Sequence, residues 1–168
     1  MVEQPNGDFA HTVVRQFLFD NYHYHLLKEL LNSADAQLAA IAEKAVKEAA
    51  YHLKWSSEWL IRLGDGTDES RRRLDRALGT LWRYQDELTQ PTPAETELQS
   101  LGVLPAYAAL LPSMQAHTAR VLAEATVPLP TGPGYRGAGG KLGRHSEHLG
   151  YLLAELQYLQ RSYPGLQW

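Results

Sequence analysis

The sequence predicts an all-α fold arranged as a bundle of helices, and three observations support this prediction. Residues 35–63 contain neither Pro nor Gly. Apolar residues recur at three- and four-residue steps in several segments, which is the spacing of a helix with one buried face. No stretch has the alternation and length of a convincing β-strand. A helix over residues 35–63 would be about 43 Å long, so we expect the rest of the chain to pack along it.

The long helix has a signal at each end. Ser33 and Asp35 are residues that cap helix starts, and Gly64 is a residue that ends helices. One face is apolar and another is charged, and a mixed strip lies between them. Any function carried by this helix is expected on that strip, which holds Lys44, Glu48, Tyr51, His52, Trp55 and Trp59.

Two further helices are expected beside the long one. The first covers roughly residues 9–31 and is capped by Asp8. The connection over residues 32–34 is short, which favours an antiparallel helical hairpin. A third helix is expected over residues 68–88, with Thr67 as its cap.

The second half of the chain is less regular. It predicts a short helix over residues 94–101, then a helix that begins at Pro105 and is interrupted near Pro112. Residues 127–144 are rich in Gly and Pro and predict a loop. The last helix is expected over residues 146–161, and its many leucines predict burial on more than one side.

Length and composition exclude several classes of protein. The 168 residues predict a single domain over residues 1–168. A net charge of −3 gives no general attraction to nucleic acid or to an anionic membrane. The chain has no cysteine, which excludes disulfides and thiolate metal sites. It has no apolar run long enough to span a membrane, and we expect a cytoplasmic protein.

A carboxylate-bridged di-iron site is the first chemistry to test in a helical bundle. Such a site uses Glu from two helices and a Glu-x-x-His pair from each of two others. The chain has no Glu-x-x-His pair; the nearest equivalent is Asp20 with His23, in the middle of the first helix. Glu48 on the long helix is followed by Tyr51 where the motif needs His, with His52 next to it. Roughly half of a ligand set is therefore present.

Two lysines weigh against a metal at this place. Lys44 and Lys47 flank Glu48 on the long helix, and a cation there competes with a metal ion for the same carboxylates. The favoured interpretation is a buried polar network in place of a metal site, formed by Asp20, His23, Lys44, Lys47, Glu48, Tyr51 and His52. The alternative is a working iron site that uses Asp20, His23, Glu48 and His52 with Glu147 or Glu155.

Two other patterns have both a functional and a structural interpretation. Gly132, Gly134 and Gly137 form a literal G-x-G-x-x-G, but no strand precedes it and no helix follows at once, so a connector or partner-binding loop is favoured over a nucleotide site. Four arginines open the third helix, where the helix dipole disfavours positive charge. They form either a solvated face or a docking patch for an acidic partner or a phosphate: Arg71, Arg72, Arg73 and Arg76.

Four blocks of the sequence carry a resemblance that spans nearly the whole chain. They read VEQPNGDFAHTVVRQFLFD, LAAIAEKAVKEAAYHLKWSSEWLIRLGDGTDES, LWRYQDEL and GGKLGRHSEHLGYLLAELQYLQRSYPG. These blocks resemble the C subunits of the bacterial phenylacetyl-CoA epoxidases, the multicomponent monooxygenases of aerobic phenylacetate breakdown.

The resemblance implies a ferritin-like bundle and a subunit without a catalytic site of its own. In that family the C subunit is a paralogue of the catalytic A subunit, which carries the di-iron centre, and it keeps that subunit folded and competent. The B and E subunits complete the system. The resemblance therefore implies no cofactor in this chain, an A subunit as its partner, and a relict metal site filled by polar contacts.

The family usually carries two more helices before the point where this sequence starts. The resemblance therefore implies an apolar face without its usual cover. We expect exposed apolar surface on the first and long helices, which would favour self-association.

Overall fold

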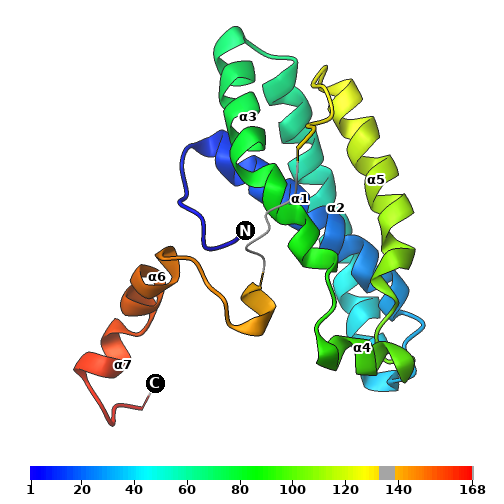
Figure 1. Cartoon of the computed structure of the whole chain (residues 1–168), viewed down its shortest axis with the longest axis vertical. Coiled ribbons are helices and arrows are strands. Elements are labelled where there is room, and N and C mark those ends of the chain that lie inside the picture. The colour runs from blue at the N-terminus through cyan, green and yellow to red at the C-terminus, as the bar shows by residue number, and fades with distance from the viewer. Residues whose placement is uncertain (133–138, 168) are drawn as a thin grey trace.

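The computed structural model describes residues 1–132 and 139–167, and regular structure within them is entirely helical (Figure 1). The predicted all-α class is therefore confirmed. None of the helices in these residues is long and apolar enough to cross a membrane. The elements are α1 (Phe9–Leu30), α2 (Ala36–Gly64), α3 (Asp68–Leu81), η1 (Trp82–Thr89), α4 (Pro93–Ser100), α5 (Tyr107–Glu124), η2 (Gly140–Leu142), α6 (His148–Leu156) and α7 (Tyr158–Ser162).

Helices α1 and α2 form the predicted antiparallel hairpin, and the other helices of the bundle pack around it (Figure 1). The predicted caps are in place: the Asp8 side chain accepts from the backbone N–H of His11, and Asp35 accepts from two backbone N–H groups at the start of α2. The Ser33 hydroxyl donates to the carbonyl of Val103 over 2.7 Å, which fixes the turn between the two helices.

Helix α3 begins as predicted and ends earlier than predicted. Thr67 and Ser70 form a reciprocal capping box at its start. After Leu81 the chain tightens into the 3-10 helix η1. This tighter turn keeps Trp82, Tyr84 and Leu88 against the main core, partly buried.

Helix α5 runs through Pro112, so the predicted interruption is wrong. Pro112 lies in the second turn of the helix, where its missing N–H removes the backbone bond to the carbonyl of Ala108 and leaves the following turns intact. The short helix α4 matches the predicted range to within one residue at each end; it starts from a capping box between Thr92 and Glu95.

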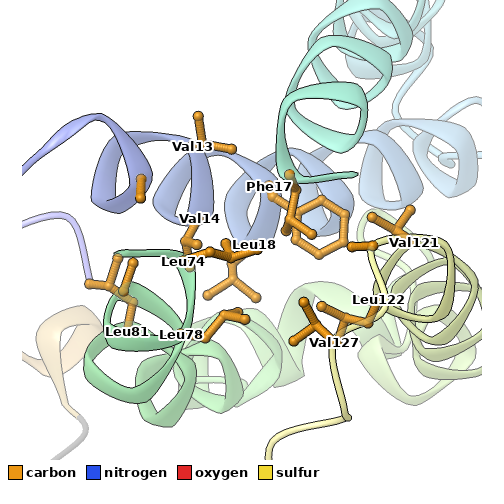
Figure 2. Packing of buried hydrophobic residues seen from close by; sticks show 14 of the residues in the cluster. Val13, Val14, Phe17, Leu18, Leu74, Leu78, Leu81, Val121, Leu122 and Val127 are labelled. Carbon is orange, nitrogen blue, oxygen red and sulfur yellow. The ribbon is translucent and has the colours of Figure 1, made fainter. Parts of the chain in front are cut away.

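The main core lies where α1 meets α3 and α5. Figure 2 shows apolar side chains of α1 directed toward leucines of α3 and toward the end of α5. The fully buried members include Val13, Val14, Phe17, Leu74, Leu81 and Val121. Helix α2 comes very close to the residue after α5, because a Cβ built on Gly64 would overlap the carbonyl oxygen of Ala125 and lie 2.8 Å from its Cβ.

The C-terminal part of the chain differs most from the prediction. Residues 146–161 do not form one buried helix; α6 and α7 are separate, with Gln157 between them. Both extend away from the bundle (Figure 1), and every described residue from 150 to 167 is exposed. No described helix of the bundle offers these leucines a surface. The preceding loop, predicted over residues 127–144, contains the short helix η2.

Exposed apolar side chains were expected on the first two helices. Phe9 is 48% exposed, Ile41 55% and Tyr51 65%. These side chains are spaced along the hairpin, and the larger group of exposed apolar residues lies on α6 and α7.

Candidate functional site

A small cluster of ionisable side chains lies between α1 and α2, around Asp20. This carboxyl is only 3% exposed. Burial raises its pKa, while the Ser56 hydroxyl and the nearby imidazoles of His52 and His23 oppose that rise. The Oδ2 atom of Asp20 is buried without a hydrogen-bond partner. The carboxyl is therefore held in a place that disfavours its charge.

His23 completes this cluster on the α1 side. Burial lowers its pKa, and the neighbouring Asp20 only partly opposes the effect. Its ring stacks on Phe19 with centroids 5.4 Å apart. The cluster thus combines one buried carboxyl with imidazoles from both helices of the hairpin.

The remaining members of the predicted network lie elsewhere. Lys44, Lys47, Glu48 and Tyr51 lie toward the outer surface of α2, where Glu48 and Tyr51 are exposed. The Glu48 carboxylate is 77% exposed, and its close ionic contact is with His52, 3.8 Å away on the next turn. The expectation that Lys44, Lys47, Glu48 and Tyr51 belong to one buried polar network with Asp20 is therefore wrong. These four residues sit outside the buried face of the helix.

The cluster does not fit a di-iron centre. Such a centre needs about four carboxylates with two imidazoles, and here the Glu48 carboxylate faces solvent. Glu147 and Glu155, the other proposed ligands, lie on the C-terminal segment away from Asp20. Within the described residues, no group of three or more His, Asp or Glu side chains is placed to hold a metal ion.

The arginines of α3 are largely paired within the chain. Arg71 contacts Asp75 at 3.0 Å and also donates to the carbonyl of Thr126. Arg72 and Arg73 share the carboxylate of Glu69. Arg76 is exposed. These internal pairs leave less free positive charge for an acidic partner than the sequence suggests, and the docking patch stays a prediction.

Sequence reasoning missed a half-buried imidazole in α5. His117 lies over the Phe17 ring, with centroids 6.0 Å apart. Burial lowers its pKa to about 4, and Arg120 adds to the effect. The Ser57 hydroxyl donates to the carbonyl of Leu53 over 2.6 Å, so the 3.0 Å contact between Ser57 and His117 requires Nε2 of His117 to be the donor. A neutral His117 therefore ties α5 to α2.

A hollow of about 340 Å³ opens between α1, η1 and α5. Asn21 lines it from α1, and its amide nitrogen donates to the carbonyl of Met114 and to the hydroxyl of Thr118. The apolar lining includes Leu18, Trp82 and Leu129. No motif in the sequence marks this place, because its residues come from four separated segments.

Carboxylates elsewhere in the chain bind the start of the C-terminal segment, residues 140–146. Glu3 accepts from the side chains of His145 and Ser146 and from the Ser146 backbone, each over 2.7 Å. Glu87 accepts from the backbone N–H of Gly140 over 2.9 Å. Burial alone would raise the pKa of Glu3, but the bonds from Ser146 and His145 lower it to about 2.

Lys141 adds a further set of contacts between the start of the C-terminal segment and the rest of the chain. Its ammonium contacts the Glu95 carboxylate at 3.0 Å and donates to the carbonyls of Leu88 and Gln90. Tyr107 donates to the same Glu95 oxygen over 2.7 Å. We call the contacts of Glu3, Glu87 and Glu95 with residues 140–146 the latch. No sequence pattern marks the latch, because its partners are 46 to 143 positions apart.

The predicted G-x-G-x-x-G lies mostly outside the described residues. Gly134 and Gly137 fall in the segment 133–138, and only Gly132 belongs to the described part.

The fold and the cluster define the general class first: a ferritin-like, all-α bundle in which a buried carboxyl lies near imidazoles of two long helices. The family model described as "Phenylacetic acid catabolic protein" matches residues 1–168. A relative from Escherichia coli K12, the C subunit of 1,2-phenylacetyl-CoA epoxidase, is 46% identical over all 168 residues of this chain, which span 67% of that relative. The chain belongs to the phenylacetic acid catabolic protein family.

Proposed function

We propose that this chain is a structural subunit of a phenylacetyl-CoA epoxidase, without a catalytic metal site of its own. In this role it packs against the catalytic A subunit, a paralogue that carries the di-iron centre, and supports its fold. The B and E subunits complete the cytoplasmic complex, which epoxidises the ring of phenylacetyl-CoA.

One observation carries the non-catalytic assignment. Asp20 is enclosed between α1 and α2, whereas the Glu48 carboxylate, which would have to face it across a metal pair, is 77% exposed. Carboxylates in these two settings cannot share one metal ion without a rearrangement of α2. The similarity to the C subunit of an epoxidase supports the choice of complex.

Native mass spectrometry of this chain co-expressed with the catalytic subunit of the same organism, in iron-rich medium, tests the proposal. We expect a complex whose iron stays with the catalytic subunit when the two are separated. Two iron ions on this chain would overturn the proposal and favour the alternative, an iron site that uses Asp20, His23, Glu48 and His52 with Glu147 or Glu155.

The Asp20→Asn variant gives a second readout. Asn keeps the shape of Asp20 and removes the charge that burial disfavours. In a structural subunit the variant should bind the catalytic subunit as before and unfold at an equal or higher temperature. An iron-binding chain would instead lose its metal.

A further inference from the structure

The C-terminal arm, residues 139–167, is an apolar segment without a surface to cover it. In Figure 1 it leaves the bundle and carries α6 and α7 away from the other helices. Eight large apolar side chains from Tyr151 to Leu166 are between 38% and 78% exposed. Scattered single exposed apolar residues are ordinary on protein surfaces, but this many on one short segment indicate an interaction site.

The arm is held in place at its N-terminal end, residues 140–146. Glu3 and Glu87 accept four hydrogen bonds from residues 140–146, and Lys141 joins Glu95. These bonds fix where the arm leaves the bundle, and they involve none of its leucines. The chain therefore presents α6 from a defined position.

Helix α6 has the pattern of a helix that lies in a groove. Leu149, Leu152, Leu153 and Leu156 occupy positions i, i+3, i+4 and i+7, which place them on one face. Tyr151 is about 200° around the helix from Leu149 and lies on the opposite side. Leu156 is 73% exposed and Tyr151 78%, so neither side chain is needed to hold this chain's own fold.

The area of the arm matches one side of a stable interface. Tyr151 lies on the opposite side and is left out of this area. At roughly 200 Å² per fully exposed side chain of this size, the other seven exposed residues present on the order of 700 Å². A standard protein–protein interface buries about 800 Å² on each partner. The hollow of about 340 Å³ beside Asn21 has the size of a small-ligand pocket and cannot take in seven such side chains.

The low charge of the arm indicates what kind of surface it binds. Between His148 and Arg161 the charged residue is Glu155, so the matching surface is apolar and nearly uncharged. The α6 helix has nine residues, too few for a stable pair with one helix of the same kind in water. A groove between helices of a folded protein surrounds the leucine face on two sides.

We propose that the leucine face of α6 docks into an apolar groove between helices of the catalytic subunit. This inference rests on the proposed function, in which that subunit is the partner. The arm then contributes a preformed helix, and the latch sets its position before binding.

The test compares two variants that add the same charge to α6: Leu156→Glu on the leucine face and Tyr151→Glu on the opposite side. Affinity for the purified catalytic subunit of the same organism is measured by isothermal titration calorimetry with the 168-residue chain. We expect Leu156→Glu to weaken binding at least about 30-fold, the size of an interface hot spot. Tyr151→Glu should change binding less than about threefold.

The outcomes separate this inference from the proposed function. Equal binding of both variants and the original chain would overturn the role of the arm and leave the proposed function standing. No binding of the original chain would overturn both. A third outcome would also overturn the inference: the original chain is a dimer, Leu156→Glu is a monomer, and both bind the catalytic subunit equally well. In that case a second copy of this chain would be the partner of the leucine face. Circular dichroism spectra should match for all three chains.

Discussion

At the scale of single residues, burial and not residue type separates Asp20, His23 and His117 from the polar groups on the outer surface of the helices. Asp20 is buried, His23 and His117 are half-buried, and burial is the largest cause of their shifted pKa values. Glu48, which the sequence placed in the same network as Asp20, is exposed. The difference follows from where each residue falls on the circumference of its helix.

Glu48→Ala is expected to change the free energy of unfolding by less than about 0.5 kcal/mol, because this side chain is exposed and its contact with His52 spans 3.8 Å. The measurement is urea unfolding at pH 7. A loss of several kcal/mol would show that Glu48 belongs to a buried network after all.

His117 should make the chain less stable in mild acid. Its pKa is lowered to about 4 in the folded state, so the unfolded chain takes up a proton first as the pH falls. The stability is fully present above about pH 6.5 and is lost between about pH 6.5 and pH 4. The loss from this residue is smaller than the limit of about 1.4 kcal/mol per pH unit, because the ring is partly exposed and solvent screens it. His117→Leu cannot titrate and should show a shallower dependence in urea unfolding at pH 7, 6 and 5. Parallel curves for the two chains would contradict this account.

At the scale of elements, the starts of the first three helices were the most predictable features. Asp8, Asp35 and Thr67 cap the helices that the sequence assigned to them, because capping depends on two or three neighbouring residues. The interruption at Pro112 was wrong, since the effect of a proline depends on its distance from the helix start.

The approach of α2 to the chain after α5 predicts a sharp contrast between two glycines. Gly64→Ala should destabilise the protein by about 2 kcal/mol, because the new Cβ would overlap the Ala125 carbonyl oxygen. Gly79→Ala in α3 is the matched control: nothing lies within 4 Å of its Cβ position, and the change should stabilise by about 0.5–1 kcal/mol. Thermal unfolding measures both. Equal effects would mean that α2 and the Ala125 backbone are not in contact.

At the scale of the whole molecule, the features that sequence reasoning missed join distant segments. The latch pairs Glu3 with Ser146, and the hollow beside Asn21 combines α1 with η1 and α5. Periodicity reports which face of a helix is apolar, but it does not say which helix meets that face. The arm illustrates this limit, because its leucines predicted burial that the described bundle does not provide.

The latch should open in acid. The pKa of Glu3 is lowered to about 2 in the folded state, so its contribution is present above pH 4.5 and is lost as the pH falls from 4.5 toward 2. Hydrogen exchange should show residues 140–146 losing protection in this range before α1 and α2 do. Glu3→Gln should show the faster exchange already at pH 7, with a cost on the order of 2 kcal/mol to the latch. Protection factors of residues 140–146, which correct for the pH dependence of exchange in an unfolded chain, that stay constant from pH 4.5 to pH 2 would contradict the role of Glu3.

The latch also bears on the order in which the molecule folds. Its bonds between Glu3 and Ser146 close a loop of 143 positions, whereas α1 and α2 meet through a short turn. Contacts of low sequence separation form fastest, because closing a long loop costs more entropy. During synthesis, α1 to α5 therefore have time to assemble before residues 140–146 leave the ribosome. The leucines of α6 reach a bundle that is already formed, which shortens the time they spend near unfolded chain and lowers the risk of misfolding around them.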